Sequence, residues 1–285
     1  MATKPSARAQ QERSDQSRAR ILGAAIHEFS EAGLAGARTD RIAAAAGVNK
    51  ALLYYYFEDK EALYSAAMEA VAQQVLASGM AVMEAGRSAG ERLVHFALSH
   101  FDRIHSQREF QSLMQQEMIR LHRGEKNALT SLVEKVFRPM MLRLHEVFAE
   151  GCQAGELIPV DELQMVYAAL GANVFYFLSG PVMEIIFGMD PFERSALEHR
   201  RRAAMEYLGQ TIFADRRHGA RVAAEVLAAN PMPATNLPVW RSRAYLDLPP
   251  RSEGGGAGPA RRSRPGKGRP LEHPQHQAGR IRKMR

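Results

Sequence analysis

The sequence predicts an all-α protein, and three observations support this fold class. Apolar residues recur at helical spacing along most of the chain, whereas no segment alternates as a half-buried strand would. Residues that favour helix starts, such as Ser, Thr, Asn and Asp, stand directly before these apolar patterns. Glycines follow several of the patterns, where a helix would end. Together these signals predict about nine or ten helices.

Three helices are expected in the first sixty residues. The first ends at Gly33, a residue type that suits the position just after a helix. Thr39 is expected to cap a short alanine-rich helix that stops at Gly47, and Asn49 to cap another that ends near Phe57. The apolar face of the first helix comprises Ile21, Leu22, Ala25, Ile26 and Phe29.

Further caps mark the later helices. Asp59 precedes a long amphipathic segment over residues 60–85. Gly180-Pro181 predicts a kink or break, because proline removes a backbone donor inside a helix. Three segments have the spacing of a capping box, in which Glu or Gln follows the capping residue three positions later. They are Ser88–Glu91, Asp161–Gln164 and Asp190–Glu193, the last with Pro191 at the favoured first helical position.

Composition places the chain among globular proteins. With 46% hydrophobic and 24% charged residues, 285 residues can bury one large core or two ordinary ones, which excludes collagen, mucin and wholesale disorder. The longest apolar run, residues 170–178, is half the length of a membrane span, so no span is expected. Residues 1–20 lack the apolar segment of a secretion signal. Cys152 is the only cysteine, so we expect no internal disulfide, no cysteine-rich metal site and a cytoplasmic location.

The net charge of +7 is distributed unevenly. Residues 238–285 carry 12 Lys and Arg against 3 Asp and Glu, whereas residues 61–237 carry 17 against 21. The basic character therefore belongs mostly to the C-terminal tail. Charge alone supports only a weak, non-specific attraction of that tail to nucleic acid.

Residues 39–63 carry the most informative pattern. Two short helices joined through Gly47 and Val48 have the turn length of a helix-turn-helix. Ile42, Val48, Leu53 and Phe57 are spaced to form a small core, which leaves residues 49–52 and 54–56 on or near the opposite face.

Three consecutive tyrosines, Tyr54, Tyr55 and Tyr56, fan across about 200° of a helix. At least one must therefore present its hydroxyl to water or to a ligand. Tyr, Thr, Lys and helix N-terminal amides are common phosphate ligands. Taken alone, the three tyrosines fit equally a short helix of an ordinary bundle with one buried ring and two half-exposed ones.

The full pattern over residues 17–64 resembles the DNA-binding domain of the TetR family of transcriptional regulators. The resemblance spans the whole three-helix unit, with many residue types at fixed offsets. It is carried by Arg20-Ile-Leu-x-Ala-Ala-x-x-x-Phe29-x-x-x-Gly33, Thr39-x-x-Ile42-Ala43-x-x-Ala46-Gly47-Val48 and Leu53-Tyr54-Tyr55-Tyr56-Phe57-x-x-Lys60-x-x-Leu63.

The resemblance implies roles for individual residues. Lys50, Ala51 and Leu52, after Asn49 at the front of the recognition helix, would lie in the major groove of double-stranded DNA. Leu52 cannot donate a hydrogen bond, so apolar contact with a thymine methyl group is expected there. Tyr56 stands where the family often has His. The residues expected to contact backbone phosphates are Thr39, Tyr54, Tyr55 and Lys60.

The resemblance also implies a homodimer. Residues 163–178 are apolar almost all round, and such a helix must be covered on both sides. The helix that follows has an apolar stripe beside the basic run at residues 200–202. The alternative is the core of an ordinary monomeric bundle. The stripe comprises Leu197, Ala204, Tyr207, Leu208 and Ile212.

The middle of the chain would then bind an effector. Apolar walls with a few polar groups suit a small hydrophobic or aromatic molecule. Core packing explains each candidate residue better than ligand contact does, since Met commonly fills gaps in cores. The candidates are Phe96, His100, Met114, Met118, Phe137, Met141, Tyr167, Asn173 and Tyr176.

Signals for catalysis and metal binding are weak. The Gly-x-Ser-x-Gly match at residues 86–90 has helical patterns on both sides, whereas a nucleophile elbow needs a strand before the serine. His95, His100 and His105 recur every five residues, which scatters them over different faces of a helix. We therefore expect no enzyme activity, no metal and no cofactor.

These observations predict four parts and one function. The parts are a flexible N-terminal arm (1–16), a DNA-binding domain (17–63), a helical effector-binding and dimerisation domain (64–229) and a basic, disordered tail (230–285). The expected function is a ligand-responsive repressor that binds a palindromic operator as a homodimer. The alternative is a non-specific nucleic-acid-binding or scaffold protein that acts through its tail.

Overall fold

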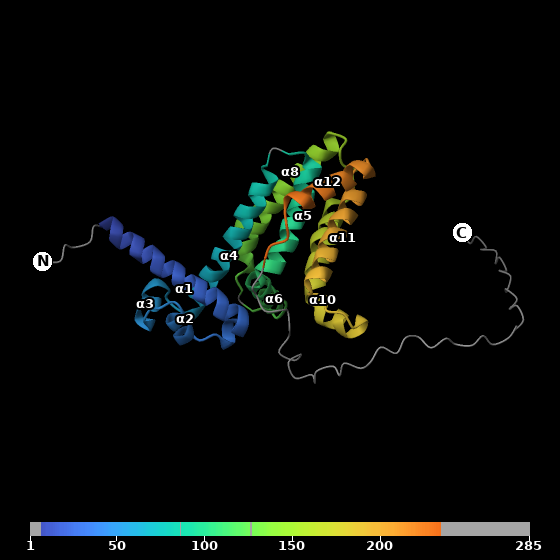
Figure 1. The fold of residues 1–285 in the computed structure, drawn as a ribbon. Helices are drawn as coiled ribbons and strands as arrows, with labels where there is room; N and C mark the ends of the chain where they lie inside the picture. Colours follow the sequence, from blue (N-terminus) through green and yellow to red (C-terminus); the bar gives the residue numbers. More distant parts are fainter. Residues whose placement is uncertain (1–6, 86, 126, 235–285) are drawn as a thin grey trace, which may run out of the picture. The chain divides into compact units, whose positions relative to one another are not determined.

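The computed structural model describes residues 7–85, 87–125 and 127–234, and these residues form helices joined by short loops (Figure 1). Within this part of the chain the sole bridge pairs Leu157 with Phe213, so the predicted all-α class is confirmed. Two segments, η1 and η2, are π-helical. The elements are α1 (Ala7–Gly36), α2 (Thr39–Ala45), α3 (Lys50–Tyr56), α4 (Lys60–Met83), α5 (Ala89–Ser106), α6 (Arg108–His122), α7 (Leu129–Leu132), η1 (Val133–Phe137), α8 (Arg138–Gln153), α9 (Glu162–Val166), η2 (Tyr167–Gly171), α10 (Ala172–Phe187), α11 (Arg194–Ile212) and α12 (Arg216–Ala229).

The first helix begins inside the segment that we expected to be a flexible arm, residues 1–16. Residues 7–16 are helical, and residues 1–6 lie outside the described part. Pairs four residues apart support this segment: Arg8 Nε donates to Glu12 Oε1 at 3.1 Å, and Gln11 Nε2 donates to Asp15 Oδ1 at 3.0 Å. At the other end Gly33 has a φ of 69°, which fits its expected place at the helix end.

The first hydrophobic core lies among α1, α2, α3 and α4, with α6 and α7 at its edge. Ile42, Leu53 and Phe57 are buried there and Val48 is partly buried, as their spacing predicts. The ring of Phe29 meets the ring of Tyr64 edge-on, with centroids 5.0 Å apart. The short α2 and α3 therefore owe their stability to packing against α1 and α4.

The second core is built around α5, which packs against α4, α8, α10, α11 and α12. Asp102 of α5 accepts two hydrogen bonds from Arg201 of α11, at 2.7 and 2.8 Å. Arg201 also donates to the carbonyl of Asn230, just after α12. Where α11 and α12 cross, a Cβ atom placed on Gly219 would lie 1.9 Å from the carbonyl oxygen of Gly209. Only glycine lets these two helices approach so closely.

The two cores are joined through α4 and α6. Leu76 of α4 and Phe137 of η1 pack against both. From α6, Ser112 Oγ donates to the carbonyl of Ser30 in α1 at 2.8 Å, and Gln116 Nε2 donates to the same carbonyl at 3.3 Å. The first helix is thus held by side chains that follow α4 in the chain.

The elements α9, η2 and α10 form one continuous helix over residues 162–187. Pro181 lies inside α10, so of the expected kink or break the break is wrong: proline's fixed φ is compatible with a helix. By length and composition alone the helix could cross a membrane, a test that helices of soluble proteins also pass. The expectation of no membrane span is based on the apolar run of residues 170–178, which is much shorter than this helix.

The predicted caps have mixed outcomes. Ser88 and Asp161 cap α5 and α9, accepting from the backbone N–H of Glu91 and of Gln164. The box expected at residues 190–193 is wrong, because α11 begins later, at Arg194. Asp190 accepts instead from the N–H of Phe192 at 2.8 Å, in a turn that the buried Phe192 ring anchors.

The chain divides into two units, residues 1–242 and 243–285. The second unit, and with it most of the basic tail expected from the sequence, lies outside the described residues.

Acid should destabilise the fold through His100. Burial, with Arg103 nearby, lowers the pKa of His100 to about 4, from 6.5 in an unfolded chain. Neutral His100 therefore stabilises the fold above pH 6.5, and this contribution is lost as the pH falls toward 4. We expect it to amount to at most about 3 kcal/mol. Urea unfolding from pH 7 to pH 4 should show a shallower decline for His100→Gln. An equally steep decline in the variant would contradict the prediction.

Candidate nucleic-acid interface

The helices α2 and α3 are held in a helix-turn-helix by a tight turn and a side-chain cap. Gly47 has a φ of 63°, the left-handed conformation predicted for it. Asn49 begins α3 as expected, and its Oδ1 accepts from the N–H of Leu52 at 2.7 Å. This cap fixes the start of the helix that carries the predicted base contacts.

The outer face of α3 exposes the predicted side chains. Tyr55 is 79% exposed and Tyr54 40%, which confirms that the three tyrosines cannot all be core. Ala51 is exposed and Leu52 is half-buried. The face turned away from the first core thus presents phenol rings and small apolar groups.

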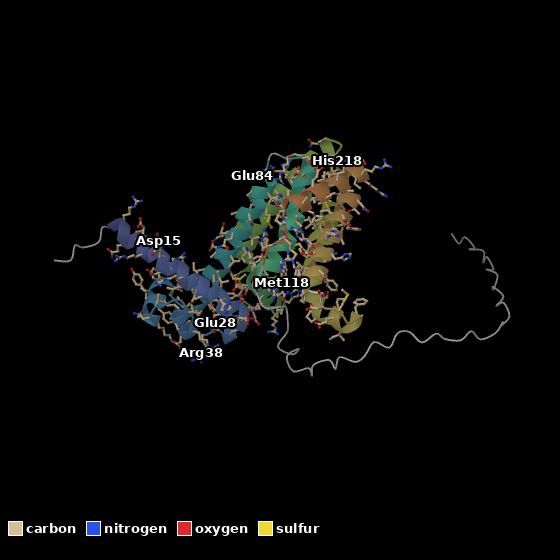
Figure 2. The ribbon with its side chains drawn as sticks, viewed as in Figure 1. Asp15, Glu28, Arg38, Glu84, Met118 and His218 are labelled. Carbon is tan, nitrogen blue, oxygen red and sulfur yellow. The ribbon has the colours of Figure 1, made fainter. Side chains whose placement is uncertain are left out.

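Thr39 is not the cap expected at the start of α2. The helix is preceded by Arg38, whose backbone N–H donates to Glu28 Oε1 of α1 at 3.1 Å (Figure 2). Thr39 is buried instead, and its hydroxyl lies 3.2 Å from the hydroxyl of Tyr54. No side chain caps α2, the Glu28 carboxylate instead anchors the residue before it to α1, and the Thr39 hydroxyl orients Tyr54.

Both predicted lysines have partners within the chain. Lys50 Nζ lies 2.8 Å from Asp40 Oδ1, a hydrogen-bonded ion pair that lowers the pKa of Asp40. Lys60 Nζ donates to the carbonyls of Ala35 and Ala37, at 3.2 and 3.1 Å. Lys60 therefore ties the start of α4 to the end of α1 whether or not it also reaches a phosphate.

The start of α1 lies beside α3, which the sequence did not predict. The hydroxyls of Ser14 and Tyr56 are 3.0 Å apart, and the Arg18 guanidinium lies 5.4 Å from the centroid of the Phe57 ring. A Cβ atom placed on Gly47 would lie 3.5 Å from Arg20 Nη1, so this guanidinium rests against the turn. Ser14 and Tyr56 are 42 residues apart, and no local pattern marks such a pair.

The predicted effector residues do not gather in one place. Phe96 and His100 lie on α5, and Phe137 and Met141 are partly buried near the second core. The others are scattered. Met114 belongs to the first core, Met118 is 52% exposed, Tyr167 is 66% exposed, Asn173 is buried and donates to the carbonyl of Ala97, and Tyr176 donates to the carbonyl of Pro191.

A pocket of about 440 Å³ opens elsewhere, between α5, the helix of residues 162–187 and α11. Its walls are mostly apolar, and alanines from all three segments, among them Ala97, Ala169 and Ala204, contribute to them. Arg200 lines one side, with its guanidinium 5.6 Å from the centroid of the Tyr176 ring. The small alanine side chains leave room for the pocket. Candidates chosen for large apolar and aromatic side chains therefore do not include its walls.

The other two signals have structural roles or no cluster. The Ser88 hydroxyl donates to Glu156 Oε1 at 2.6 Å and accepts from the N–H of Glu91 at 3.2 Å, as a helix cap does. Among the residues that the structure describes, no three His, Cys, Asp or Glu side chains could share a metal ion.

The geometry of α2, the turn and α3 defines a helix-turn-helix DNA-binding protein. A family model described as "Bacterial regulatory proteins, tetR family" matches residues 21–67, and one described as "Tetracyclin repressor-like, C-terminal domain" matches residues 87–208. The chain belongs to the TetR family, and it is a helix-turn-helix transcriptional regulator.

Curated relatives agree with this assignment. The HTH-type transcriptional repressor SCO4008 of Streptomyces coelicolor is 50% identical over 52 residues, which are 18% of this chain and only 27% of that protein. The HTH-type transcriptional regulator RutR of Escherichia coli K12 is 27% identical over 170 residues, which are 59% of this chain and 77% of RutR.

Solved structures show the same fold. A gamma-butyrolactone receptor (ArpA-like protein) has a TM-score of 0.51 at 17% identity, over 76% of this chain and all of that one. The ketosteroid transcriptional regulator KstR2 of Mycobacterium tuberculosis has a TM-score of 0.51 at 18% identity, over 70% of this chain and 95% of that one.

Proposed function

We propose that this regulator is a ligand-responsive repressor that binds a roughly palindromic operator as a homodimer. The observation that carries the proposal is α3, a capped helix that exposes Tyr54, Tyr55 and Ala51 on the face turned away from its core. Two such helices would enter successive major grooves about 34–36 Å apart. Two relatives are named as transcriptional repressors, which supports repression rather than activation.

An exposed apolar surface supports the homodimer. Soluble monomers rarely expose contiguous apolar patches larger than a few hundred Å². Here large apolar side chains are exposed along one continuous helix, and Tyr207 is exposed on the neighbouring α11. On the continuous helix they are Leu163, Tyr167, Phe175, Leu178, Val182, Ile185, Ile186 and Phe187. We propose that a second copy of the chain covers this surface.

A charge on this surface should abolish dimerisation. Leu178→Glu would force a carboxylate into the proposed interface, where its desolvation is unfavourable. Light scattering after gel filtration should give twice 31.7 kDa for the parent and about 31.7 kDa for the variant. Leu142→Glu, at an exposed leucine on α8, is the control and should remain dimeric. A dimeric Leu178→Glu protein would contradict this interface.

The pocket beside α5 and α11 supports an effector. Apolar walls with few polar groups suit a small hydrophobic molecule. The structural neighbours include proteins named for a gamma-butyrolactone and a ketosteroid. An effector that binds one arrangement of the dimer more tightly would shift the population and lower operator affinity by that difference.

Selection of random duplex DNA on the full-length protein tests the proposal. Recovery of one palindromic site is the expected result, and that site then serves for screening effectors. Enrichment of no site by a folded dimer would contradict the proposed operator binding. Non-specific binding through the basic tail would then be the better account.

Substitutions in α3 should separate base reading from phosphate contact. Leu52→Ala should change base preference at one position of each half-site, because a lost thymine contact affects that position only. Tyr55→Phe should weaken binding by about tenfold, uniformly across sequences, because a phosphate contact carries no base information. Repeating the selection with each variant measures both effects. Unchanged preference for Leu52→Ala would exclude it as a base-reading residue.

A further inference from the structure

The pocket between α5 and α11 has one charged side chain, Arg200, among the described residues that line it. Its walls contain no Asp or Glu, so the positive charge has no compensating negative charge there. The other polar groups are the amide of Gln164 and the hydroxyls of Tyr207 and Thr211. Arg200 and Thr211 are eleven residues apart on α11, which is about 16 Å along the helix. The charge therefore lies toward one end of a long and mostly apolar pocket.

The guanidinium of Arg200 is largely withdrawn from water but has no anionic partner. Its Nε is buried and lacks a hydrogen-bond acceptor in the part of the chain that the structure describes. Its Nη2 donates to the carbonyl of Ala172 at 3.4 Å, which is long for such a bond. Burial lowers the pKa of Arg200, whereas Arg201, the next residue, has Asp102 as its partner. Because a desolvated charge without a counterion is unfavourable, an anion in the pocket would stabilise Arg200.

Aromatic rings hold Arg200 in place. Its guanidinium lies 5.6 Å from the centroid of the Tyr176 ring, within the range of a cation–π interaction. The hydroxyl of Tyr176 donates to the carbonyl of Pro191, and its ring meets the Phe177 ring edge-on, with centroids 5.5 Å apart. A side chain that is already ordered loses little conformational entropy when a ligand binds. Arg200 is thus prepared to bind an anion.

The apolar part of the pocket continues toward α8. A narrow space of about 20 Å³ adjoins it and shares five lining residues with it, among them Ala169. The walls that are added there include Leu93 and Phe96 of α5 and Leu144 of α8. The segment η2 contributes to both spaces, and π-helical turns are frequent at functional sites. The body of a bound molecule should therefore be apolar and extend away from the guanidinium.

We infer that the effector carries a carboxylate on an apolar body, and that Arg200 binds the carboxylate while the apolar walls enclose the body. The planar guanidinium matches the two oxygens of a carboxylate. A phosphate monoester has a charge of about −1.5 to −2 at neutral pH, which a single arginine does not balance. The inference rests on the proposed effector binding and names the chemical class of the effector.

Isothermal titration calorimetry with the full-length protein tests the inference. The probes are hexanoate, octanoate, decanoate and phenylpropanoate, each compared with its primary amide. At least one carboxylate should bind about ten- to a hundredfold more tightly than its amide, because hydrogen bonds between charged groups differ from neutral ones by about that factor. Arg200→Gln should remove this preference and leave the amide affinity unchanged. Arg202→Gln, at an exposed arginine of α11 outside the pocket walls, is the matched control and should keep the preference.

Two further measurements separate loss of the anion site from other effects. Thermal unfolding without any probe should give Arg200→Gln a Tm no lower than that of the parent, since the substitution removes an unpaired charge. Light scattering should show that this variant is still a dimer. A monomeric variant would overturn the inference, because the anionic partner of Arg200 would then belong to the second copy of the chain.

The binding data can overturn the inference in two ways. One is that no carboxylate of the panel binds more tightly than its amide. The other is that Arg200→Gln keeps the preference, which would place the carboxylate elsewhere. A carboxylate that binds through Arg200 but leaves operator affinity unchanged would instead contradict the proposed ligand response, so the two failures are distinguishable.

Discussion

Replacing Glu117 by alanine should lower the free energy of unfolding by about 3 to 5 kcal/mol. This carboxylate has no exposed surface and lies where α4, α6 and α7 meet. It accepts from the Tyr64 hydroxyl at 2.9 Å, from Arg120 Nη1 at 2.7 Å and from the N–H of Ala128. Burial and the adjacent carboxylate raise the pKa of Tyr64, so its hydroxyl stays protonated and donates.

The loss of stability comes from the buried donors that the substitution leaves without an acceptor. Without Glu117, the buried Tyr64 hydroxyl and the Ala128 N–H lose their acceptor, and each unsatisfied buried group costs about 1–3 kcal/mol. Arg120 keeps Glu125, whose Oε2 lies 3.3 Å from its Nε, so the lower half of the range is expected.

Urea unfolding at pH 7 measures the effect, and Glu117→Gln is the matched control. The amide keeps the size of the side chain and one acceptor, so it should lose distinctly less stability than alanine does. Equal losses for alanine and glutamine would show that the charge matters more than the hydrogen-bond geometry. A loss below about 1 kcal/mol for alanine would contradict the network's role.

Gly219→Ala should also destabilise strongly, by about 3 kcal/mol or more. The added methyl group would lie 1.9 Å from the carbonyl oxygen of Gly209 and 2.7 Å from the Phe213 ring, both distances far inside van der Waals contact. The helix α12 would have to move away from α11, which opens the second core. The better helix propensity of alanine recovers only about 1 kcal/mol.

A second glycine in a helix serves as a control for whether steric overlap causes the destabilisation by Gly219→Ala. Gly23 also lies inside a helix, α1, and a Cβ atom there would meet nothing within 4 Å. Gly23→Ala should therefore raise stability by up to about 1 kcal/mol, through helix propensity alone. Thermal and urea unfolding of both variants should show opposite signs. A neutral Gly219→Ala variant would mean that the two helices separate at little cost.

Local patterns predicted the helix-turn-helix well. Gly47 and Asn49 determine the turn and the start of α3 through their own backbone and side-chain chemistry, and both appear in the structure as expected. The burial of Ile42 and Leu53 follows from helical spacing for the same reason. Each of these features depends on residues only a few positions apart.

Interactions between distant segments account for what the sequence could not show. Thr39 has the right chemistry for a cap, but α2 begins after Arg38, whose N–H is held by Glu28 of another helix, and Thr39 is buried against Tyr54. The helical start of α1 is supported by Ser14 and Tyr56, which are 42 positions apart. The pocket arises where alanines of three segments face one another, and alanine carries no periodic signal of its own.

The sharing of Leu76 and Phe137 between the two cores limits how the regulator can be rebuilt. A chimera that exchanged residues 1–63 for the DNA-binding unit of a relative would have to place a backbone carbonyl where that of Ser30 accepts from Ser112 and Gln116 of α6. The grafted unit would carry a surface that is complementary to another protein's α6, not to this one. New operator specificity is therefore more readily obtained by rewriting exposed positions of α3, which belong to neither core, than by exchanging the whole unit.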